Sequence, residues 1–289
     1  MTSTLFLYSG LLTHFILMSQ PPSDCDSDPE DILSTSLQTL YGYAPISHSS
    51  HGKDFTYISK ASSGGSVVTL RIPDTQPANW ALHASSVWVS SIYLADHLED
   101  LCLGHHQGSP PENKVRVLEL GAGAGLPSIL IAKTVRAVQM IASDFPDDVL
   151  IRTLTDNVRN NGVSDQCRVV PYAWGTEVSS LTRELFDVIV ACDTLWNSEL
   201  HPLFIDALCA LLKKTSDARI HLIAGLHTGR YTLQAFMDAA RSAGLDIRNA
   251  RERKVTSGCV QREWSVSRAE AENERERRQW VVWITLAWP

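Results

Sequence analysis

The 289-residue chain offers little that would point to a metal, a disulfide framework or a nucleic acid. Its six cysteines form no C-x-x-C pair and stand at no His/Cys ligand spacing, which is typical of reduced, mostly buried thiols in an intracellular protein. The formal net charge is −7 at pH 7 and no long basic stripe is visible, which disfavours nucleic-acid binding. The pair His105-His106 has no carboxylate or cysteine at ligand spacing, so we expect no metal there.

An apolar run long enough to span a bilayer, about 20 residues, is also lacking. The apolar residues 5–18 are too few, and no Lys or Arg precedes them as in a signal peptide. Three interpretations stay open: a docking helix, a weak targeting segment, or an extension upstream of a true start at Met18. We favour the last, and we interpret residues 1–28 as an extraneous or disordered leader of a cytoplasmic protein.

The most informative stretch is residues 115–126, VRVLELGAGAGL. Its first half is a short apolar run, which predicts a strand buried on both faces. Gly121, Gly123 and Gly125 follow at once, and glycine permits a sharp turn and the close approach of a ligand. A strand, a glycine turn and a helix start form a cradle typical of nucleotide-like ligands. The alternative is a tight turn that binds nothing.

Two acidic residues indicate which ligand this cradle holds. A dinucleotide fingerprint, G-x-G-x-x-G, requires a glycine where this chain has Leu126. Glu119, at the end of the strand, would repel a pyrophosphate but attract the ammonium and sulfonium groups of S-adenosylmethionine. Asp144 ends the next predicted strand, where an acidic side chain accepts hydrogen bonds from ribose hydroxyls. The alternative for Asp144 is a surface turn before Pro146. Together, the glycine turn, Glu119 and Asp144 predict S-adenosylmethionine as the cofactor.

Strands and helices alternate over residues 115–243, which predicts a parallel sheet with right-handed crossovers. The expected strands are 115–120, 139–144, 167–173, 186–192, 219–225, 246–255 and 280–288, and the expected helices are 126–135, 147–160, 199–212 and 231–243. Because no comparable helix joins the last two strands, they should form an antiparallel hairpin. The predicted fold class is α/β, a Rossmann-like, seven-stranded, doubly wound sheet with the ligand beyond the carboxyl ends of its strands.

An N-terminal extension, residues 29–112, should pack on this core, residues 113–289. Its expected elements are helices at 29–41 and 80–98 and strands at 55–59 and 67–72. Near the other end lies a charged insert, residues 257–279, in which residues 265–278 have alternating Glu and Arg. That pattern is typical of a solvated helix with i,i+4 pairs, and a protein-docking surface is the alternative.

These motifs resemble those of class I S-adenosylmethionine-dependent methyltransferases, and more narrowly methyltransferase family sixteen. The chain is similar there to fungal nicotinamide N-methyltransferase-like proteins, relatives of elongation-factor lysine and N-terminal methyltransferases. The resemblance covers nearly everything from residue 29 onward. It rests on VLELGAGAGLPSI (117–129), SDFPD (143–147), PYAWG (171–175), ACDTLWN (191–197), AGLHTGR (224–230), VQREW (260–264) and RRQWVVWITL (277–286).

The resemblance also implies which residues bind the cofactor. The residues implied are Glu119, Gly121, Gly123, Gly125, Asp144, Phe145, Trp174, Trp88 and Asp193. The first four would hold the methionine end and Asp144 the ribose. Phe145 and Trp174 would lie against the adenine, and Trp88 would help to cover the cofactor. Plain core packing is the alternative for both tryptophans, and His83 either lies near the methionine moiety or is solvated.

For the acceptor, the resemblance implies Asp193, Trp196 and His227 as catalytic residues. Residues 193–196, DTLW, occupy the slot of the family's acidic-x-x-aromatic motif, in which lysine methyltransferases usually end on Tyr or Phe. Trp196 departs from that pattern and indicates a differently shaped pocket. An aromatic wall beside a carboxylate can orient an amine and stabilise the developing cation. His227 would contact the acceptor or relay a proton and Arg230 would hold a carboxylate, whereas helix capping is the alternative for Asp193 and for this loop.

The resemblance therefore implies an S-adenosylmethionine-dependent N-methyltransferase that acts on an amine nitrogen. A protein lysine or N-terminus is the first substrate hypothesis. A small nitrogen heterocycle or amine of nicotinamide type is the second, and a catalytically silent, cofactor-binding regulatory protein is the third. We expect a monomer that binds no metal, no nucleic acid and no membrane.

Overall fold

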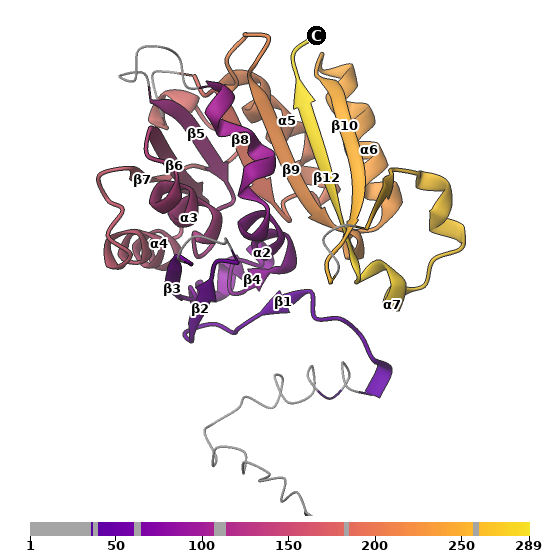
Figure 1. Cartoon of the computed structure of the whole chain (residues 1–289), viewed down its shortest axis with the longest axis horizontal. Coiled ribbons are helices and arrows are strands. Elements are labelled where there is room, and N and C mark those ends of the chain that lie inside the picture. Colours follow the sequence, from indigo (N-terminus) through magenta and orange to yellow (C-terminus); the bar gives the residue numbers. More distant parts are fainter. Residues whose placement is uncertain (1–35, 37–39, 61–64, 107–113, 182–184, 257–259) are drawn as a thin grey trace, which may run out of the picture.

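A mostly parallel sheet of eight strands forms the centre of the molecule (Figure 1). The computed structural model describes residue 36 and residues 40–60, 65–106, 114–181, 185–256 and 260–289. The strand order is β11-β10-β12-β9-β8-β5-β6-β7. The parallel strands are β5 (Val115–Leu120), β6 (Val138–Asp144), β7 (Cys167–Pro171), β8 (Val188–Cys192) and β9 (Arg219–Gly225).

Three antiparallel strands complete the sheet: β10 (Asp246–Lys254), β11 (Gln261–Glu263) and β12 (Trp280–Ala287). The predicted fold class is confirmed, including the antiparallel C-terminal hairpin. The structure adds one strand to the seven expected, because the short, polar β11 has no apolar alternation that would reveal it in the sequence.

Helices cover both faces of the sheet (Figure 1). One face carries α2 (Val89–Asp96), α3 (Leu126–Thr134) and α4 (Asp148–Asn160), and the other carries α5 (His201–Leu211) and α6 (Arg230–Ser242). Within β5, Val115 and Val117 point into the first layer, whereas Leu118 and Leu120 point into the second. This alternation explains why β5 is apolar throughout, since a strand between two helical layers has no solvated face.

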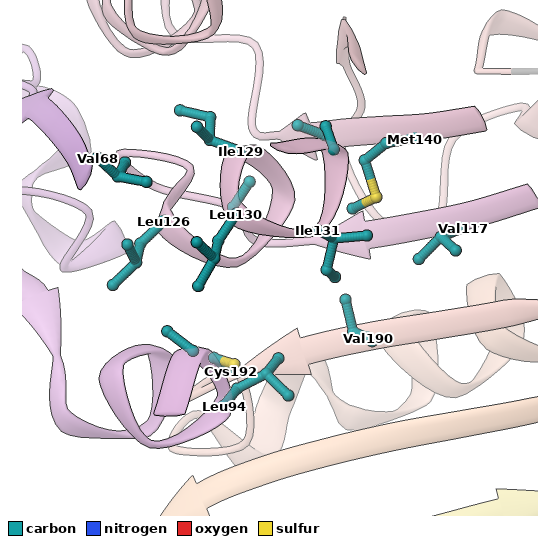
Figure 2. Packing of buried hydrophobic residues seen from close by; sticks show 14 of the residues in the cluster. Val68, Leu94, Val117, Leu126, Ile129, Leu130, Ile131, Met140, Val190 and Cys192 are labelled. Atoms are coloured by element: carbon teal, nitrogen blue, oxygen red, sulfur yellow. The ribbon is translucent and has the colours of Figure 1, made fainter. Parts of the chain in front are cut away.

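Helix α3, which follows the glycine turn, is buried along most of its length. Figure 2 shows Leu126, Ile129, Leu130 and Ile131 of α3 packed against Val68 of β3 and residues of the sheet. The predicted hairpin that supplies Val68 is confirmed as β2 (Asp54–Ile58) and β3 (Val67–Arg71), which pair antiparallel. The outer side of α3 is thus covered by the N-terminal extension, and this explains a helix that is apolar all round.

The prediction of one helix over residues 80–98 was wrong. A 3-10 helix, η1 (Pro77–Leu82), ends at His83, whose backbone is left-handed with φ of 53°. The chain then forms β4 (Val87–Trp88), which pairs with β1 (Ser47–His48), and α2 begins only at Val89. The apolar periodicity of this stretch therefore reflects burial against different neighbours instead of a single helical face.

The prediction of one solvated helix over residues 265–278 was also wrong. The described residues of the charged segment 257–279 form β11, η7 (Val266–Glu270) and the short α7 (Glu274–Arg277). They surround Arg230, whose side chain is fully buried and bonds to both carboxylate oxygens of Glu252 and of Glu272 at 2.6–2.8 Å. Several of these charges therefore form a buried ion-pair cluster.

Some predictions fall where the structure describes little. The apolar residues 5–18 and the leader 1–28 lie outside the described residues, as does most of the predicted helix 29–41. Of that helix, the described Ser36, Leu40 and Tyr41 are helical. Within the described part of the chain, no helix has the length and apolar character needed to cross a bilayer.

Candidate functional site

A cavity of about 350 Å³ opens where the carboxyl ends of β5 and β8 meet. This is where the strand order reverses direction, the position at which open α/β sheets bind ligands. Its walls are the glycine turn 121–126, residues 144–145 after β6, residues 172–174 after β7, residues 192–197 after β8, and residues 78–88 around η1. The size lies in the range of ligand pockets, and no Lys or Arg is among the described residues that line it.

The glycine turn has the backbone that its sequence requires. Gly121, Gly123 and Gly125 have φ of 73°, 54° and 89°, a region that other residues rarely adopt. A Cβ on Gly121 would lie 2.8 Å from Cγ2 of Thr194, whereas one on Gly123 would meet nothing nearer than 3.9 Å. Gly121 therefore permits close packing behind the turn, and Gly123 leaves space on the cavity side for a ligand.

The amides of this turn are already committed to protein acceptors. The N–H groups of Gly121 and Ala122 donate to the carbonyl of Ser143 at 3.0 Å, and that of Gly123 donates to Oδ2 of Asp144 at 2.6 Å. Amides engaged in this way, beside a carboxylate, are a poor site for a pyrophosphate. A ligand with positive charge and hydroxyl groups fits better, as S-adenosylmethionine has.

Asp144 is half-buried on the cavity wall at the end of β6. Its Oδ1 accepts a hydrogen bond of 2.7 Å from the amide of Phe145, and its Oδ2 accepts the one from Gly123. Burial raises the pKa of Asp144 to about 6, against the opposing effect of these two hydrogen bonds. The carboxylate is thus held rigidly at the cavity and keeps free lone pairs for hydroxyl donors.

Glu119 lies behind the turn and is not among the residues that line the cavity. Its Oε2 accepts hydrogen bonds from the amide and hydroxyl of Ser128 in the first turn of α3, and its Oε1 has no partner among the described residues. Only 1% of the surface of Glu119 is exposed, and this burial raises its pKa to about 8. Its contact with the cofactor stays a prediction, since in this arrangement the carboxylate fastens the turn to α3.

Both aromatic side chains that were expected against the adenine line the cavity. Phe145, next to Asp144 in the chain, is 37% exposed. The ring centroid of Trp174 lies 4.4 Å from that of Phe204 in α5. The indole therefore packs on the core with one part and faces the cavity with another, so core packing and ligand contact are compatible.

Asp193 stands at the other end of the cavity, in a left-handed backbone conformation with φ of 52°. Its Oδ1 accepts a hydrogen bond of 2.6 Å from the amide of Gly225, and its Oδ2 accepts one of 3.4 Å from the amide of Ser90 at the start of α2. Helix capping after residue 197 was the alternative for Asp193, but Asn197 caps that turn through Glu199. Asp193 instead joins β8, β9 and α2.

Four aromatic rings contact one another in a series, and three of them line the cavity. The imidazole of His83 lies edge-on to Trp196 at 4.8 Å and to Trp88 at 6.1 Å between centroids. Trp88 in turn stacks on His227 at 5.7 Å with an interplanar angle of 20°. His83, Trp88 and Trp196 line the cavity, but His227 does not. The structure thus brings Trp88 and Trp196 into the site and places His227 behind Trp88.

Arg230 was expected to hold a carboxylate, and its guanidinium holds two, those of Glu252 and Glu272. It is not among the residues that line the cavity. The sequence did not reveal its partners, because Glu252 and Glu272 are distant from Arg230 in the chain.

Sequence analysis missed other residues of the site. Thr194 is 8% exposed, lines the cavity, and its hydroxyl has no partner among the described residues. Asn157 of α4 donates at 2.9 Å to the carbonyls of Ala124 in the glycine turn and Arg71 in β3. No signal marks Asn157 in the sequence, because its partners are far along the chain.

The described residues contain no group of three or more His, Cys, Asp or Glu side chains that could hold a metal ion.

Comparison with known proteins gives consistent similarities. The chain is 28% identical over 186 residues to the "Protein N-terminal and lysine N-methyltransferase efm7" of Schizosaccharomyces pombe, a match covering 61% of this chain and 70% of that protein. It is 26% identical over 251 residues to the protein of the same name from Neurospora crassa, covering 78% and 79%. Among solved structures, the N-terminal domain of human METTL16 in complex with SAH matches at 16% identity and a TM-score of 0.49, covering 91% of this chain and 83% of that one.

Fold, cavity and similarities together define an S-adenosylmethionine-dependent methyltransferase. A family model described as lysine methyltransferase matches residues 69–242, more than half of the chain. The chain therefore belongs to the lysine methyltransferase family.

Proposed function

We propose that this enzyme methylates an amine nitrogen of a protein, either a lysine side chain or an N-terminal α-amine. The observation that carries the proposal is that the carboxylate of Asp193 and the partly exposed indole of Trp196 line the same cavity. A carboxylate and an aromatic face both attract a cationic amine and stabilise the charge that develops on it. The names of the relatives, which specify protein N-terminal and lysine N-methylation, support the same acceptor.

The proposal assigns the cofactor to the other end of the cavity. When bound there, S-adenosylmethionine supplies a methyl group carried on a sulfonium. Gly123 lets it approach the backbone, while Gly121 and Gly125 let the turn pack closely on Thr194 and Leu154. Asp144 accepts hydrogen bonds from its ribose. Phe145 and Trp174 provide apolar faces for its adenine.

At the acceptor end, the residues orient the amine and exclude water. Methyl transfer needs the attacking nitrogen in line with the methyl group, so positioning contributes much of the rate. Asp193 is held by two backbone amides from different elements, which fixes the direction of its carboxylate. Trp88 and Trp196 provide two indole walls.

The open mouth favours a protein acceptor over a small molecule. Trp196 is 38% exposed and His83 is exposed as well, so the rim is accessible to a large partner. A small nitrogen heterocycle is more commonly enclosed by its binding site. The net charge of −7 also favours a basic protein segment as the acceptor. We further propose that the enzyme is cytoplasmic and acts as a monomer without nucleic acid.

The test is in two steps. Calorimetric titration with S-adenosylhomocysteine and, in parallel, with NAD should give micromolar binding of the first and none of the second. The enzyme is then incubated with tritiated S-adenosylmethionine and a dialysed, heat-treated cell extract, which is separated into protein and small-molecule fractions. Label in the protein fraction supports the proposal, and label only among small molecules supports the nicotinamide-type alternative. Cofactor binding without any labelled product would indicate the regulatory alternative.

A further inference from the structure

His83 lies at the mouth of the cavity in a conformation that the chain maintains at some cost. It follows the last turn of η1, its side chain is exposed, and it lines the cavity. Its φ of 53° is left-handed, which is uncommon for residues other than glycine. Residues held in such conformations cluster at functional sites, so the position of His83 needs a physical explanation.

Three tryptophans hold His83 in place. Nε1 of Trp88 donates a hydrogen bond of 2.8 Å to the carbonyl of His83, and the amide of His83 donates one of 3.0 Å to the carbonyl of Trp80. The imidazole lies edge-on to the indoles of Trp88 and Trp196, with interplanar angles of 89° and 83°. Among the residues that the structure describes, neither ring nitrogen has a hydrogen-bond partner. The ring is thus held in place while both nitrogens stay available.

The proposed reaction needs a proton acceptor. A lysine amine has a pKa near 10.4 and an N-terminal amine one near 8, so both enter the site mostly as ammonium at pH 7. An ammonium nitrogen has no lone pair and cannot attack a methyl group. The proton must therefore leave before methyl transfer, and a side chain at the mouth can take it.

The titratable groups around His83 leave it as the best placed base. No titratable side chain lies in η1, the element before His83, or at the start of α2. After β8, Asp193 lines the cavity, whereas Glu199 does not. Asp144 lies on the wall beyond the glycine turn, and His227 is separated from the cavity by Trp88. Both carboxylate oxygens of Asp193 already accept hydrogen bonds from the amides of Gly225 and Ser90, so Asp193 suits stabilisation of positive charge better than removal of a proton.

We propose that His83 is the catalytic base that deprotonates the acceptor ammonium. This inference rests on the proposed function. One N–H bond of the ammonium breaks, its electron pair stays on nitrogen as the attacking lone pair, and the proton bonds to a ring nitrogen of His83. The imidazolium then releases the proton to water on its exposed side, which returns the neutral imidazole for the next turnover.

The experiment compares the parent enzyme with His83→Asn, because Asn tolerates the left-handed backbone and cannot act as a base at neutral pH. Initial rates of tritium transfer into the protein fraction of the dialysed, heat-treated extract are measured from pH 6.5 to 9.5. His51→Asn, at an exposed turn that does not line the cavity, is the matched control. At pH 7, His83→Asn should be slower by about 10²-fold. The deficit should shrink as pH rises, because more of the acceptor is already neutral.

Two further measurements separate a base from a structural residue. Affinity for S-adenosylhomocysteine, measured by calorimetry, should be the same in His83→Asn and the parent. In His83→Gly, which relieves the backbone and leaves space, added imidazole should restore part of the rate in proportion to its neutral form. A structural role would not respond to imidazole.

The outcomes distinguish this inference from the function on which it rests. No transfer into protein by the parent enzyme at any pH would overturn the proposed function. Transfer by the parent with an unchanged rate in His83→Asn, or with a deficit that is constant from pH 6.5 to 9.5 and unaffected by imidazole in His83→Gly, would overturn the assignment of His83 alone.

Discussion

Asp193 and Gly225 connect the ends of two parallel strands, through a hydrogen bond of 2.6 Å from the Gly225 amide to Oδ1 of Asp193. A Cβ on Gly225 would lie 2.2 Å from Nδ1 of His227 and 3.3 Å from Oδ1 of Asp193. Only glycine at this position allows both side chains to pack against the end of β9. The acceptor end of the cavity therefore depends on a residue that contributes no side chain.

Replacement of Asp193 should separate its chemical from its structural role. Asp193→Asn tolerates the left-handed backbone and keeps one acceptor oxygen, so it leaves one of the two backbone amides unpaired and should lose about 1 kcal/mol of stability. Its turnover should fall at least about tenfold, because the negative charge that stabilises the developing cation is gone. Asp193→Ala should be slower as well and also lose about 1–3 kcal/mol of stability, because it leaves two backbone amides unpaired.

Initial rates, urea unfolding and calorimetry with S-adenosylhomocysteine test this prediction. Cofactor affinity should stay close to that of the parent in both variants. If Asp193→Asn turned over at the parent rate, Asp193 would serve only to join the strand ends and α2.

The affinity for S-adenosylhomocysteine should depend on pH through Asp144. The ionised carboxylate accepts hydrogen bonds from ribose hydroxyls, and the pKa of Asp144 is raised to about 6 by burial. Affinity should therefore be constant above pH 7 and fall as pH drops through 6. Asp144→Ala should lose about 1–3 kcal/mol of binding free energy, roughly 5- to 150-fold, and most of this pH dependence.

Calorimetric titrations at pH 5.5, 6.5 and 7.5 measure this effect. Asp148→Ala is a suitable control, since Asp148 is exposed in the first turn of α4 and does not line the cavity. Equal affinities for Asp144→Ala and Asp148→Ala would remove the ribose assignment.

Glu119 should make the cofactor-free enzyme less stable as pH rises. Its pKa is about 8 in the folded state because of burial, against an ordinary value of 4.5. Between these values the unfolded chain has released the proton while the folded chain retains it, so the favourable contribution present below pH 4.5 is lost as pH approaches 8. Glu119→Gln removes this titration and should keep the hydrogen bonds with Ser128.

The free energies of unfolding of Glu119→Gln and the parent should thus diverge between pH 5 and pH 8. The variant should gain of the order of 2–4 kcal/mol relative to the parent over that range. Urea unfolding at pH 5, 6.5 and 8 measures the difference. Parallel pH dependences for the two proteins would show that Glu119 already ionises near its ordinary pKa.

The ion-pair cluster around Arg230 should be far more important for stability than a surface pair on the same helix. Arg230→Met leaves Glu252 and Glu272 with fewer partners in a buried place, which should cost about 3–5 kcal/mol. Arg241→Met breaks the exposed pair with Asp238 and should cost less than about 1 kcal/mol. Adding Glu272→Gln to Arg230→Met should recover part of the loss, because it removes one of the two negative charges that Arg230 balanced.

Urea unfolding of the three variants tests this prediction at one pH. Equal losses for Arg230→Met and Arg241→Met would mean that Arg262 and Arg268, which also pair with these glutamates, suffice without Arg230.

Features that depend on neighbours in the chain could be predicted from the sequence. Alternating strands and helices, the glycine turn and an acidic residue at the end of β6 all follow from local residue patterns. The predicted parallel strands, followed by an antiparallel hairpin, are confirmed because their local residue patterns mark each strand and each connecting helix. Asp147, the first residue of the predicted helix 147–160, caps α4 by accepting hydrogen bonds from the amides of Val149 and Leu150.

Features that depend on distant partners required the tertiary structure. Trp88 lies in a strand because it pairs with Ser47, and η1 is fastened by Asn79 to Asp147, which is 68 residues away. The sequence determined the Rossmann-like fold, the cofactor cradle and the residue types at the acceptor end. Only tertiary packing decided that His83 instead of His227 faces the cavity and that Arg230 is enclosed by carboxylates, because the direction of a side chain is set by what packs around it.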